Sequence, residues 1–304
     1  MELALILLRQ LGTLFLYMAA GVLLFKSGKI TEKGTKDMAT VLIWVVMPAV
    51  LINSFCVECT PERLQAFLDS TLLGAVSLGV ALLLGAVIFR RNPIANCATA
   101  FNNVGFMGIP LIAATIGPEA VFYIVPMAAL INIIQWTYGV KLITGEKAAV
   151  SWRNIVFSPL IISCCIGLTL FFTGLGARMP VLLTNVLSGL SAINGPLAMI
   201  IVGVYMAQTK LRPMLSTPSL YALSAVRLLL IPAVMLPVCL LLPAAQDIKM
   251  TLMICSAAPV GINVAVYSQL FGRDYGYACR SIALCTIFSI VTMPLVVVVT
   301  EWLL

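Results

Sequence analysis

Two short clusters of Asn, Gly and Pro interrupt apolar runs of this sequence, one at residues 102–110 (NNVGFMGIP) and one at 256–263 (SAAPVGIN). Proline has no amide hydrogen, so Pro259 is expected to free the carbonyl of Cys255, and Pro110 the carbonyl four residues before it. The amides of neighbouring Asn side chains can donate to such carbonyls or to a bound ligand. The clusters therefore predict two broken helices with polar groups at each break.

We expect a ligand site where the two breaks meet. The first residues of a half-helix carry about half a positive charge, which favours an anion, and glycine permits backbone angles that other residues avoid. Helix kinks without a ligand are the alternative, because membrane helices tolerate proline. The predicted substrate-binding residues are Asn102, Asn103, Gly105, Pro110, Asn132, Pro259, Gly261 and Asn263.

Three more polar side chains lie inside apolar runs. Asn132 and Gln135 are three positions apart on one helical face, from which they could line the same cavity or bond to a neighbouring helix. Arg227 lies about ten residues into its run, roughly 15 Å deep at about 1.5 Å per residue, where a charge must find partners. It could add positive potential near an anion site or tie carbonyls of neighbouring helices together, and we favour the second role.

The elements that must position these residues are membrane-spanning α-helices. Hydrophobic residues make up 62% of the 304 residues and charged residues only 10%, against about a quarter charged in soluble domains. A helix needs roughly 20 apolar residues to cross the hydrocarbon core of a bilayer. The predicted spans are 3–25, 38–56, 68–89, 94–116, 119–144, 155–174, 181–207, 217–242, 249–271 and 278–302.

The chain also shows signs of an internal repeat. Gly108-Ile109 and Gly261-Ile262 correspond at an offset of half the chain length, and each pair lies in one of the two clusters. Five spans per half would give the two halves opposite orientations in the bilayer, as in many transporters. We therefore predict two domains, residues 1–150 and 151–304, each an inverted copy of the other.

Charge predicts the topology. A net charge of +7 would suggest a nucleic-acid partner in a soluble protein, but here Lys and Arg concentrate in alternate loops. The opposite loops hold only Arg63, Arg178 and Lys249 among the basic residues. The positive-inside rule then places both termini outside the cell membrane, and we expect the lipid bilayer, rather than nucleic acid, as the macromolecular environment.

Several function classes are disfavoured by residues that are missing. The chain has no histidine, and no carboxylate falls near the middle of a predicted span. The sequence therefore offers no acid–base groups for the active site of an intramembrane enzyme. Cys56 and Cys59 form a lone C-x-x-C pair without a zinc pattern. We therefore predict no enzyme activity, no metal and no cofactor.

Three motifs together are similar to the auxin efflux carrier family: residues 102–111 (NNVGFMGIPL), 227–232 (RLLLIP) and 258–263 (APVGIN). The likeness covers essentially the whole chain. The bacterial branch, which includes permeases for malonate and malate, is the more similar, because the loop near Glu146 is short where plant members often have a long cytoplasmic one.

That resemblance implies an all-α integral membrane fold of about ten helices in two inverted five-helix repeats, whose broken fourth and ninth helices cross. The first, second, sixth and seventh helices would form a scaffold, against which the others move like an elevator. The second cluster departs from the family pattern, because Val260 separates Pro from Gly and an Asn pair is lacking. By motif, the crossover residues would be Asn102, Asn103, Pro110, Pro259, Gly261 and Asn263, with Asn132 approaching from the fifth helix.

The sequence thus predicts a secondary transporter of a small organic anion, either auxin-like or malonate/malate-like, that works by alternating access. A membrane receptor that binds a ligand at the same crossover without moving it is the alternative. A homodimer is expected, because scaffold helices face lipid in this type of fold.

Overall fold

The computed structural model describes residues 2–145, 153, 156–209 and 211–304. Its elements are helices, and one isolated antiparallel bridge joins Asn102 to Val260. The predicted all-α class is therefore confirmed for the described residues. The loop near Glu146, the predicted start of the sixth span at residue 155 and the predicted domain boundary at residues 150 and 151 lie outside the described residues.

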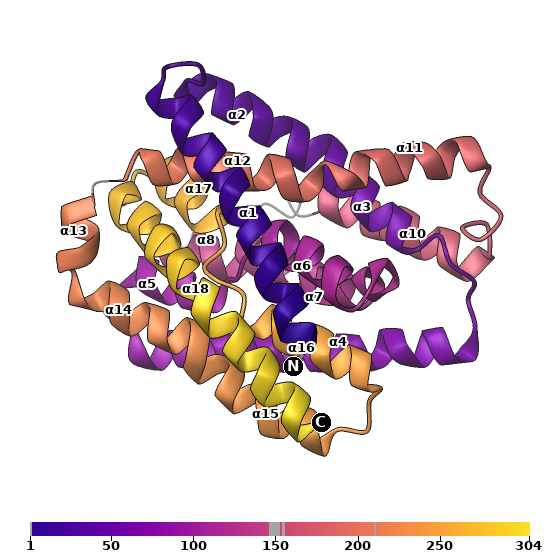
Figure 1. Cartoon of the computed structure of the whole chain (residues 1–304). Helices are drawn as coiled ribbons and strands as arrows, with labels where there is room; N and C mark the ends of the chain where they lie inside the picture. Colours follow the sequence, from indigo (N-terminus) through magenta and orange to yellow (C-terminus); the bar gives the residue numbers. More distant parts are fainter. Residues whose placement is uncertain (1, 146–152, 154–155, 210) are drawn as a thin grey trace.

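The helices of the first half run from the N-terminus to residue 144 (Figure 1). They are α1 Glu2–Lys26, α2 Glu32–Val41, η1 Leu42–Val46, α3 Met47–Ser54, α4 Pro61–Ile88, α5 Pro93–Ala100, η2 Val104–Gly108, α6 Ile109–Thr115, η3 Pro118–Ile124, α7 Val125–Ile134, η4 Gln135–Gly139 and α8 Val140–Thr144.

The helices of the second half begin at residue 159. They are α10 Pro159–Thr173, α11 Val181–Ala192, α12 Asn194–Ala207, α13 Leu211–Ser216, α14 Pro218–Ala225, η5 Val226–Leu230, α15 Ile231–Leu241, α16 Gln246–Ser256, α17 Asn263–Leu270 and α18 Tyr275–Leu303.

Seven helices of the described chain are long and apolar enough to cross a membrane, judged by length and composition. They are Leu3–Lys26, Glu32–Ser54, Pro61–Ile88, Pro118–Thr144, Val181–Ala207, Pro218–Leu241 and Tyr275–Leu303. The predicted fourth and ninth spans are each divided into two short helices, α5 with η2–α6 and α16 with α17. The predicted sixth span is the shorter helix α10.

Local sequence explains where several helices begin. Thr60, Asn92 and Ser158 each precede a proline, and each side chain accepts a hydrogen bond from the main-chain N–H three residues later. Such a cap satisfies one amide that the first turn leaves unpaired, and proline at the first helical position sacrifices no hydrogen bond. These caps start α4, α5 and α10.

Proline also shapes the interior of three helices. The π-helical turns η1, η2 and η5 each end two residues before a proline, at Pro48, Pro110 and Pro232. A proline ring clashes with the carbonyl four residues earlier in a regular α-helix. A wider turn relieves that clash, and such turns often occur at functional sites.

Two sets of helices, named here the scaffold group and the crossover group, make many of their contacts within the set, and α1 of the first set also packs against α18 of the second. In the scaffold group, α1 lies along α12, and α3 packs against α10 and α11. Gly21 and Gly203 let α1 and α12 approach closely, because a side chain at either glycine would meet main-chain atoms of the other helix. In the crossover group, α4 contacts α5, α7 and α16, and α14 and α16 pack against α18 (Figure 1).

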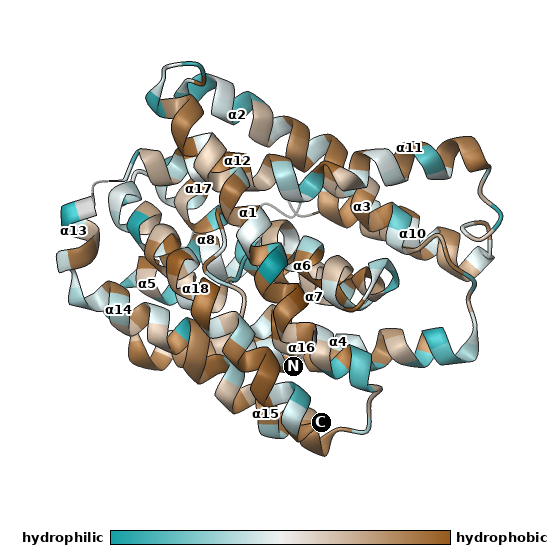
Figure 2. Ribbon diagram, in the orientation of Figure 1, coloured by the Kyte–Doolittle hydropathy of each residue, from teal (hydrophilic) through white to brown (hydrophobic). Residues whose placement is uncertain are grey.

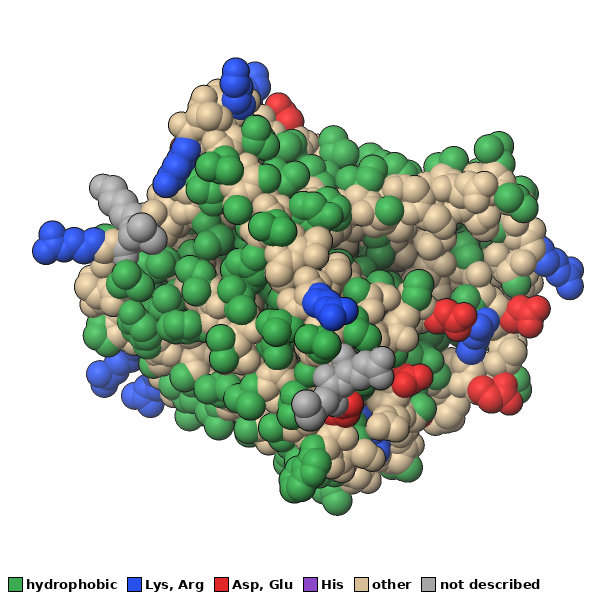
Figure 3. Space-filling model, in the orientation of Figure 1, with side chains coloured by type: hydrophobic (Ala, Val, Ile, Leu, Met, Phe, Trp, Pro, Cys, Tyr) green, Lys and Arg blue, Asp and Glu red, His purple; other side chains and the backbone are tan. Residues whose placement is uncertain are grey.

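The outer surface is apolar along the helices and charged at their ends. Large hydrophobic side chains such as Leu16, Leu23 and Val291 are 68–72% exposed, and Figure 2 shows brown, hydrophobic ribbon along most helices. Figure 3 shows many of the Lys and Arg side chains along the left of the molecule, from top to bottom, whereas most carboxylates lie toward the right and lower right together with a few basic side chains. This surface suits a chain that crosses a bilayer several times.

Candidate functional site

The two predicted breaks cross each other in the interior. The main-chain N–H of Asn103 donates to the carbonyl of Pro259 at 2.8 Å, and that of Gly261 donates to the carbonyl of Phe101 at 2.9 Å. These two bonds form the bridge that pairs Asn102 with Val260. Each interrupted segment therefore satisfies main-chain groups of the other, which lipid could not do.

Glycine at position 261 is required by this close approach. A Cβ atom there would lie 2.7 Å from the main-chain oxygen of Asn102 and 3.2 Å from that of Phe101. None of Gly105, Gly108 and Gly261 has a positive φ, so the unusual backbone angles that glycine permits are not used at these three positions. Glycine is needed at position 261 because the crossing segments leave no room for a side chain there.

The Asn102 side chain bonds to a carbonyl that the sequence predicted to be free. Its Nδ2 donates to the carbonyl oxygen of Cys255 at 2.7 Å, four residues before Pro259. The Oδ1 atom of the same amide is buried and has no hydrogen-bond partner among the described residues. Asn102 therefore joins the two segments with its donor and keeps an unused acceptor.

Arg227 binds the ends of both interrupted helices from η5. Its Nη1 donates to the carbonyl of Thr99 near the end of α5 at 3.0 Å. Its Nη2 and Nε donate to the carbonyls of Ser256 and Ala258, at the end of α16, at 2.5 and 3.0 Å. The side chain is 1% exposed. The guanidinium therefore places a full positive charge where two helix C-termini meet.

A small pocket of about 70 Å³ lies on the other side of the crossing. Its wall includes the first residues of η2 and of α17, so two helix N-termini open into it. Six of the predicted substrate-binding residues line this pocket: Asn102, Asn103, Gly105, Asn132, Gly261 and Asn263. Pro110, Pro259 and Arg227 are not part of its lining.

Two hydrogen bonds orient amides in the pocket wall. Nδ2 of Asn263 donates to Oε1 of Gln135 at 2.9 Å, and the hydroxyl of Ser158 donates to Oδ1 of Asn132 at 3.2 Å. Gln135 was absent from the predicted binding set, although its spacing from Asn132 indicated a shared face. Ser158 precedes a proline and was not singled out by any sequence pattern.

A much larger cavity, of about 890 Å³, lies between the scaffold group and α6. Of the predicted binding residues only Pro110 lines it. Its wall also includes Glu119, an acidic residue in the first turn of η3. Other polar residues of the wall are Gln10, Tyr17, Asn53, Ser54, Cys56, Thr184, Ser188, Ser191 and Asn194. Sequence reasoning missed this cavity, because its polar residues are scattered singly over several helices.

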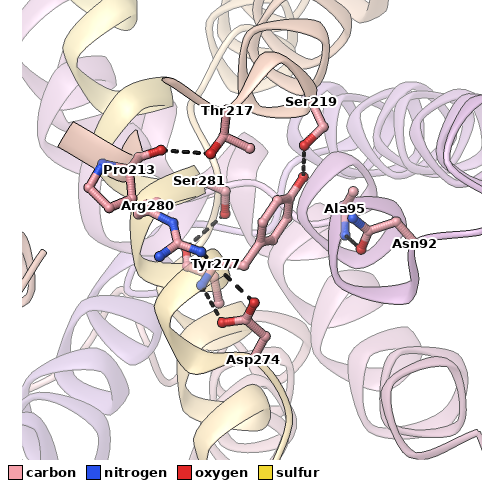
Figure 4. Close-up of polar contacts among 10 residues, drawn as sticks. Asn92, Ala95, Pro213, Thr217, Ser219, Asp274, Tyr277, Arg280 and Ser281 are labelled. Atoms are coloured by element: carbon pink, nitrogen blue, oxygen red, sulfur yellow. Dashed lines mark hydrogen bonds and ion pairs between the residues drawn. The ribbon is translucent and has the colours of Figure 1, made fainter. Parts of the chain in front are cut away.

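A second polar cluster lies where α5, α14 and α18 begin (Figure 4). The hydroxyls of Tyr277 and Ser219 are 3.1 Å apart, and Oδ1 of Asp274 accepts a hydrogen bond from the main-chain N–H of Tyr277 at 2.8 Å. Arg280 lies 3.9 Å from the Asp274 carboxylate, and the figure shows Asn92 facing its own helix start at Ala95. These contacts cap helices and hold α14 to α18, away from both cavities.

The comparisons with known proteins agree with a transport role. Residues 6–297 match a family model described as "Membrane transport protein". No curated protein matches the sequence.

Proposed function

The chain therefore belongs to the membrane transport protein family, whose members are transporters and of which the auxin efflux carriers are the type, and we propose that it carries a small organic anion by alternating access. The family and the apolar helices make it a multi-pass membrane protein.

The observation that carries the proposal is the pairing of four helix ends around the crossing. A helix terminus carries about half an elementary charge, negative at the C-terminus and positive at the N-terminus. The C-termini of α5 and α16 lie against the guanidinium of Arg227, whose charge offsets both. The N-termini of η2 and α17 face the small pocket, whose lining includes no charged side chain among the described residues.

The pocket therefore has a surplus of about one positive charge, with Asn amides in its wall. Arg227 acts on the ligand indirectly. Its positive charge offsets the negative C-termini of α5 and α16, which would otherwise cancel the positive potential of the two N-termini. A group with a single negative charge and several acceptor atoms, such as a carboxylate, fits these electrostatics. We propose that the carboxylate of the cargo binds between Asn103 and Asn263.

The sizes of the two cavities suit different parts of the transport path. Pockets for drug-sized ligands usually measure about 300–1,000 Å³. The small pocket, at about 70 Å³, offers room for the charged group alone, whereas the cavity of about 890 Å³ holds a whole organic acid. We propose that the larger cavity is the approach from the acidic side of the molecule, which we place outside the cell membrane together with both termini.

The helix bounds support two inverted five-helix repeats as the proposed architecture. An offset of 153 takes the end of α3 at Ser54 to the end of α12 at Ala207, and the end of α4 at Ile88 to the end of α15 at Leu241. The same offset takes the start of α5 at residue 93 to the start of α16 at residue 246. The first, second, sixth and seventh passes then form the scaffold group, and we propose that the crossover group moves against it.

A homodimer is a further part of the proposal. Helix α11 has no buried residue, and its Val181 and Leu182 are 73% and 74% exposed. A second copy could cover this face in the bilayer. Cross-linking of single cysteines along α11 in native membranes would reveal the dimer, and a lack of any cross-linked pair would contradict it.

The proposed function is tested by counterflow of labelled anions into proteoliposomes that contain the purified protein. Malonate, malate and indole-3-acetate cover one-charge and two-charge cargoes. Saturable flux is expected in the wild type and should be lost in Asn103→Ala and Asn263→Ala while both variants remain folded, because each removes an amide at the pocket. Unchanged flux in both variants would remove the crossover from consideration. Ligand-dependent thermal stabilisation without flux of any anion would instead favour a receptor.

A further inference from the structure

Asn194 is the first residue of α12, at the point where the scaffold helix α11–α12 is interrupted. Its Nδ2 donates to the carbonyl oxygen of Gly105 at 3.0 Å, and the side chain is 1% exposed. Gly105 belongs to η2, in the first interrupted segment. A scaffold side chain therefore holds the main chain of the crossover directly.

The bond lies between the two cavities. Asn194 contributes to the wall of the large cavity, and Gly105 to the wall of the small pocket. The neighbouring Gly195 packs against the same segment, because a Cβ atom there would lie 3.1 Å from the Cβ of Pro110. Movement of the crossover past the scaffold would have to break this polar contact, as it would the bond between Ser158 at the start of α10 and Asn132 of α7.

The amide is only half used. Oδ1 of Asn194 is buried without a hydrogen-bond partner among the described residues, and a buried unpaired acceptor is costly. A leucine at this position would have the same number of side-chain heavy atoms in a similar branched shape, and it would avoid that cost. An asparagine is therefore needed at position 194 for one feature, the hydrogen bond that its Nδ2 donates to the Gly105 carbonyl.

We infer that Asn194 is a positioning residue that holds the crossover in the conformation in which the large cavity is open. This inference rests on the proposed function, since it assumes that the crossover group moves. The hydrogen bond is made in the open conformation and must break whenever the crossover moves along the scaffold. Its loss therefore lowers the population of the open conformation and leaves the binding groups of the small pocket in place.

The test follows the openness of the cavity without any substrate. A cysteine introduced as Ser191→Cys, in the cavity wall, reports access for a water-soluble maleimide, in a background where Cys56, Cys59 and Cys165 are replaced by serine. A net hydrogen bond of average strength corresponds to about a fivefold change in an equilibrium constant. Asn194→Leu is expected to lower the open-to-closed ratio by about that factor.

Two further variants make the result decisive. Asn194→Asp keeps the shape of the side chain but places a carboxylate oxygen, which cannot donate, against the Gly105 carbonyl. It should therefore also lower the open-to-closed ratio, and it provides a test even if the leucine variant folds poorly. Asn185→Ala changes an exposed asparagine of α11 and should label like the wild type. The same variants are then assayed for anion counterflow, where a changed conformational ratio alters KM and maximal rate by different factors.

Wild-type labelling rates in both Asn194 variants, in a protein that shows saturable counterflow, would overturn the inference alone. Absence of counterflow in the wild type would count against the proposed function, whatever the labelling shows.

Discussion

Replacement of Arg227 provides the sharpest test of how the crossover is built. Arg227→Lys keeps the positive charge but replaces a planar group of five donors with a compact ammonium. The three carbonyls of Thr99, Ser256 and Ala258 come from two helices, and we expect lysine to retain about one of them. Arg227→Met removes the charge as well. The two variants therefore separate hydrogen bonding from electrostatics.

The expected magnitudes follow from those contacts. A hydrogen bond to a charged group contributes about 1.5–3 kcal/mol, so the loss of two in Arg227→Lys should destabilise the fold by about 3–6 kcal/mol. Arg227→Met leaves three buried carbonyls unpaired, at about 1–3 kcal/mol each, but it also removes the cost of burying a charge, which is several kcal/mol. Stability alone should therefore not distinguish the two variants strongly.

Anion affinity should distinguish them. Without a cation beside them, the C-termini of α5 and α16 oppose an anion at the crossing by about 1 kcal/mol each. Arg227→Met should then raise the KM for the anion about thirtyfold, whereas Arg227→Lys should change it much less. Counterflow kinetics and thermal unfolding of the purified variants measure the two effects, with Arg9→Met as control, because Arg9 is exposed on α1. Equal KM values in Arg227→Met and the wild type would refute the electrostatic reasoning.

Two more predictions concern close packing and topology. Gly261→Ala should lower thermal stability by about 1–3 kcal/mol and abolish counterflow, because its Cβ would press on main-chain oxygens of the facing segment. At Gly79 an added Cβ atom would lie in open space, so Gly79→Ala should be neutral or slightly stabilising, and equal losses in both variants would contradict the packing argument. Burial raises the pKa of the Cys56 thiol, so at neutral pH a membrane-impermeant maleimide added outside cells should label the exposed Cys59 faster. Labelling of Cys56 should increase as the pH rises and its thiolate forms, and labelling of either cysteine only from inside would invert the proposed topology.

Much of the site was accessible from the sequence because its causes are local. Proline at 259 removes an amide hydrogen wherever it stands in a helix, so the free carbonyl of Cys255 and the break around it follow from the chain itself. The same holds for the break before Pro110. The donor to that carbonyl, Asn102, lies 153 residues away in the sequence, so the identity of the donor did not follow from the local pattern. The role of Gly261 was misjudged, because close approach depends on another segment.

Other features of the site depend on neighbours far along the chain. Asn263 pairs with Gln135, and Arg227 reaches Thr99, each across more than a hundred residues. No local pattern indicates which carbonyl a buried guanidinium will find. The large cavity likewise arises from the way α1, α3 and α11–α12 are placed against α6, and its polar residues carry no common spacing in the sequence.

The sequence by itself determined an α-helical membrane protein with two broken helices, because hydrophobic length, proline and main-chain hydrogen bonding act within a few turns of one helix. Only the tertiary structure decided that the two breaks pair as a short bridge at Asn102 and Val260, with Arg227 at two helix C-termini and Asn amides at two N-termini. The physical reason is that a helix end has an electrostatic role only in relation to the groups that face it. Those groups are brought there by packing between segments that are distant in sequence.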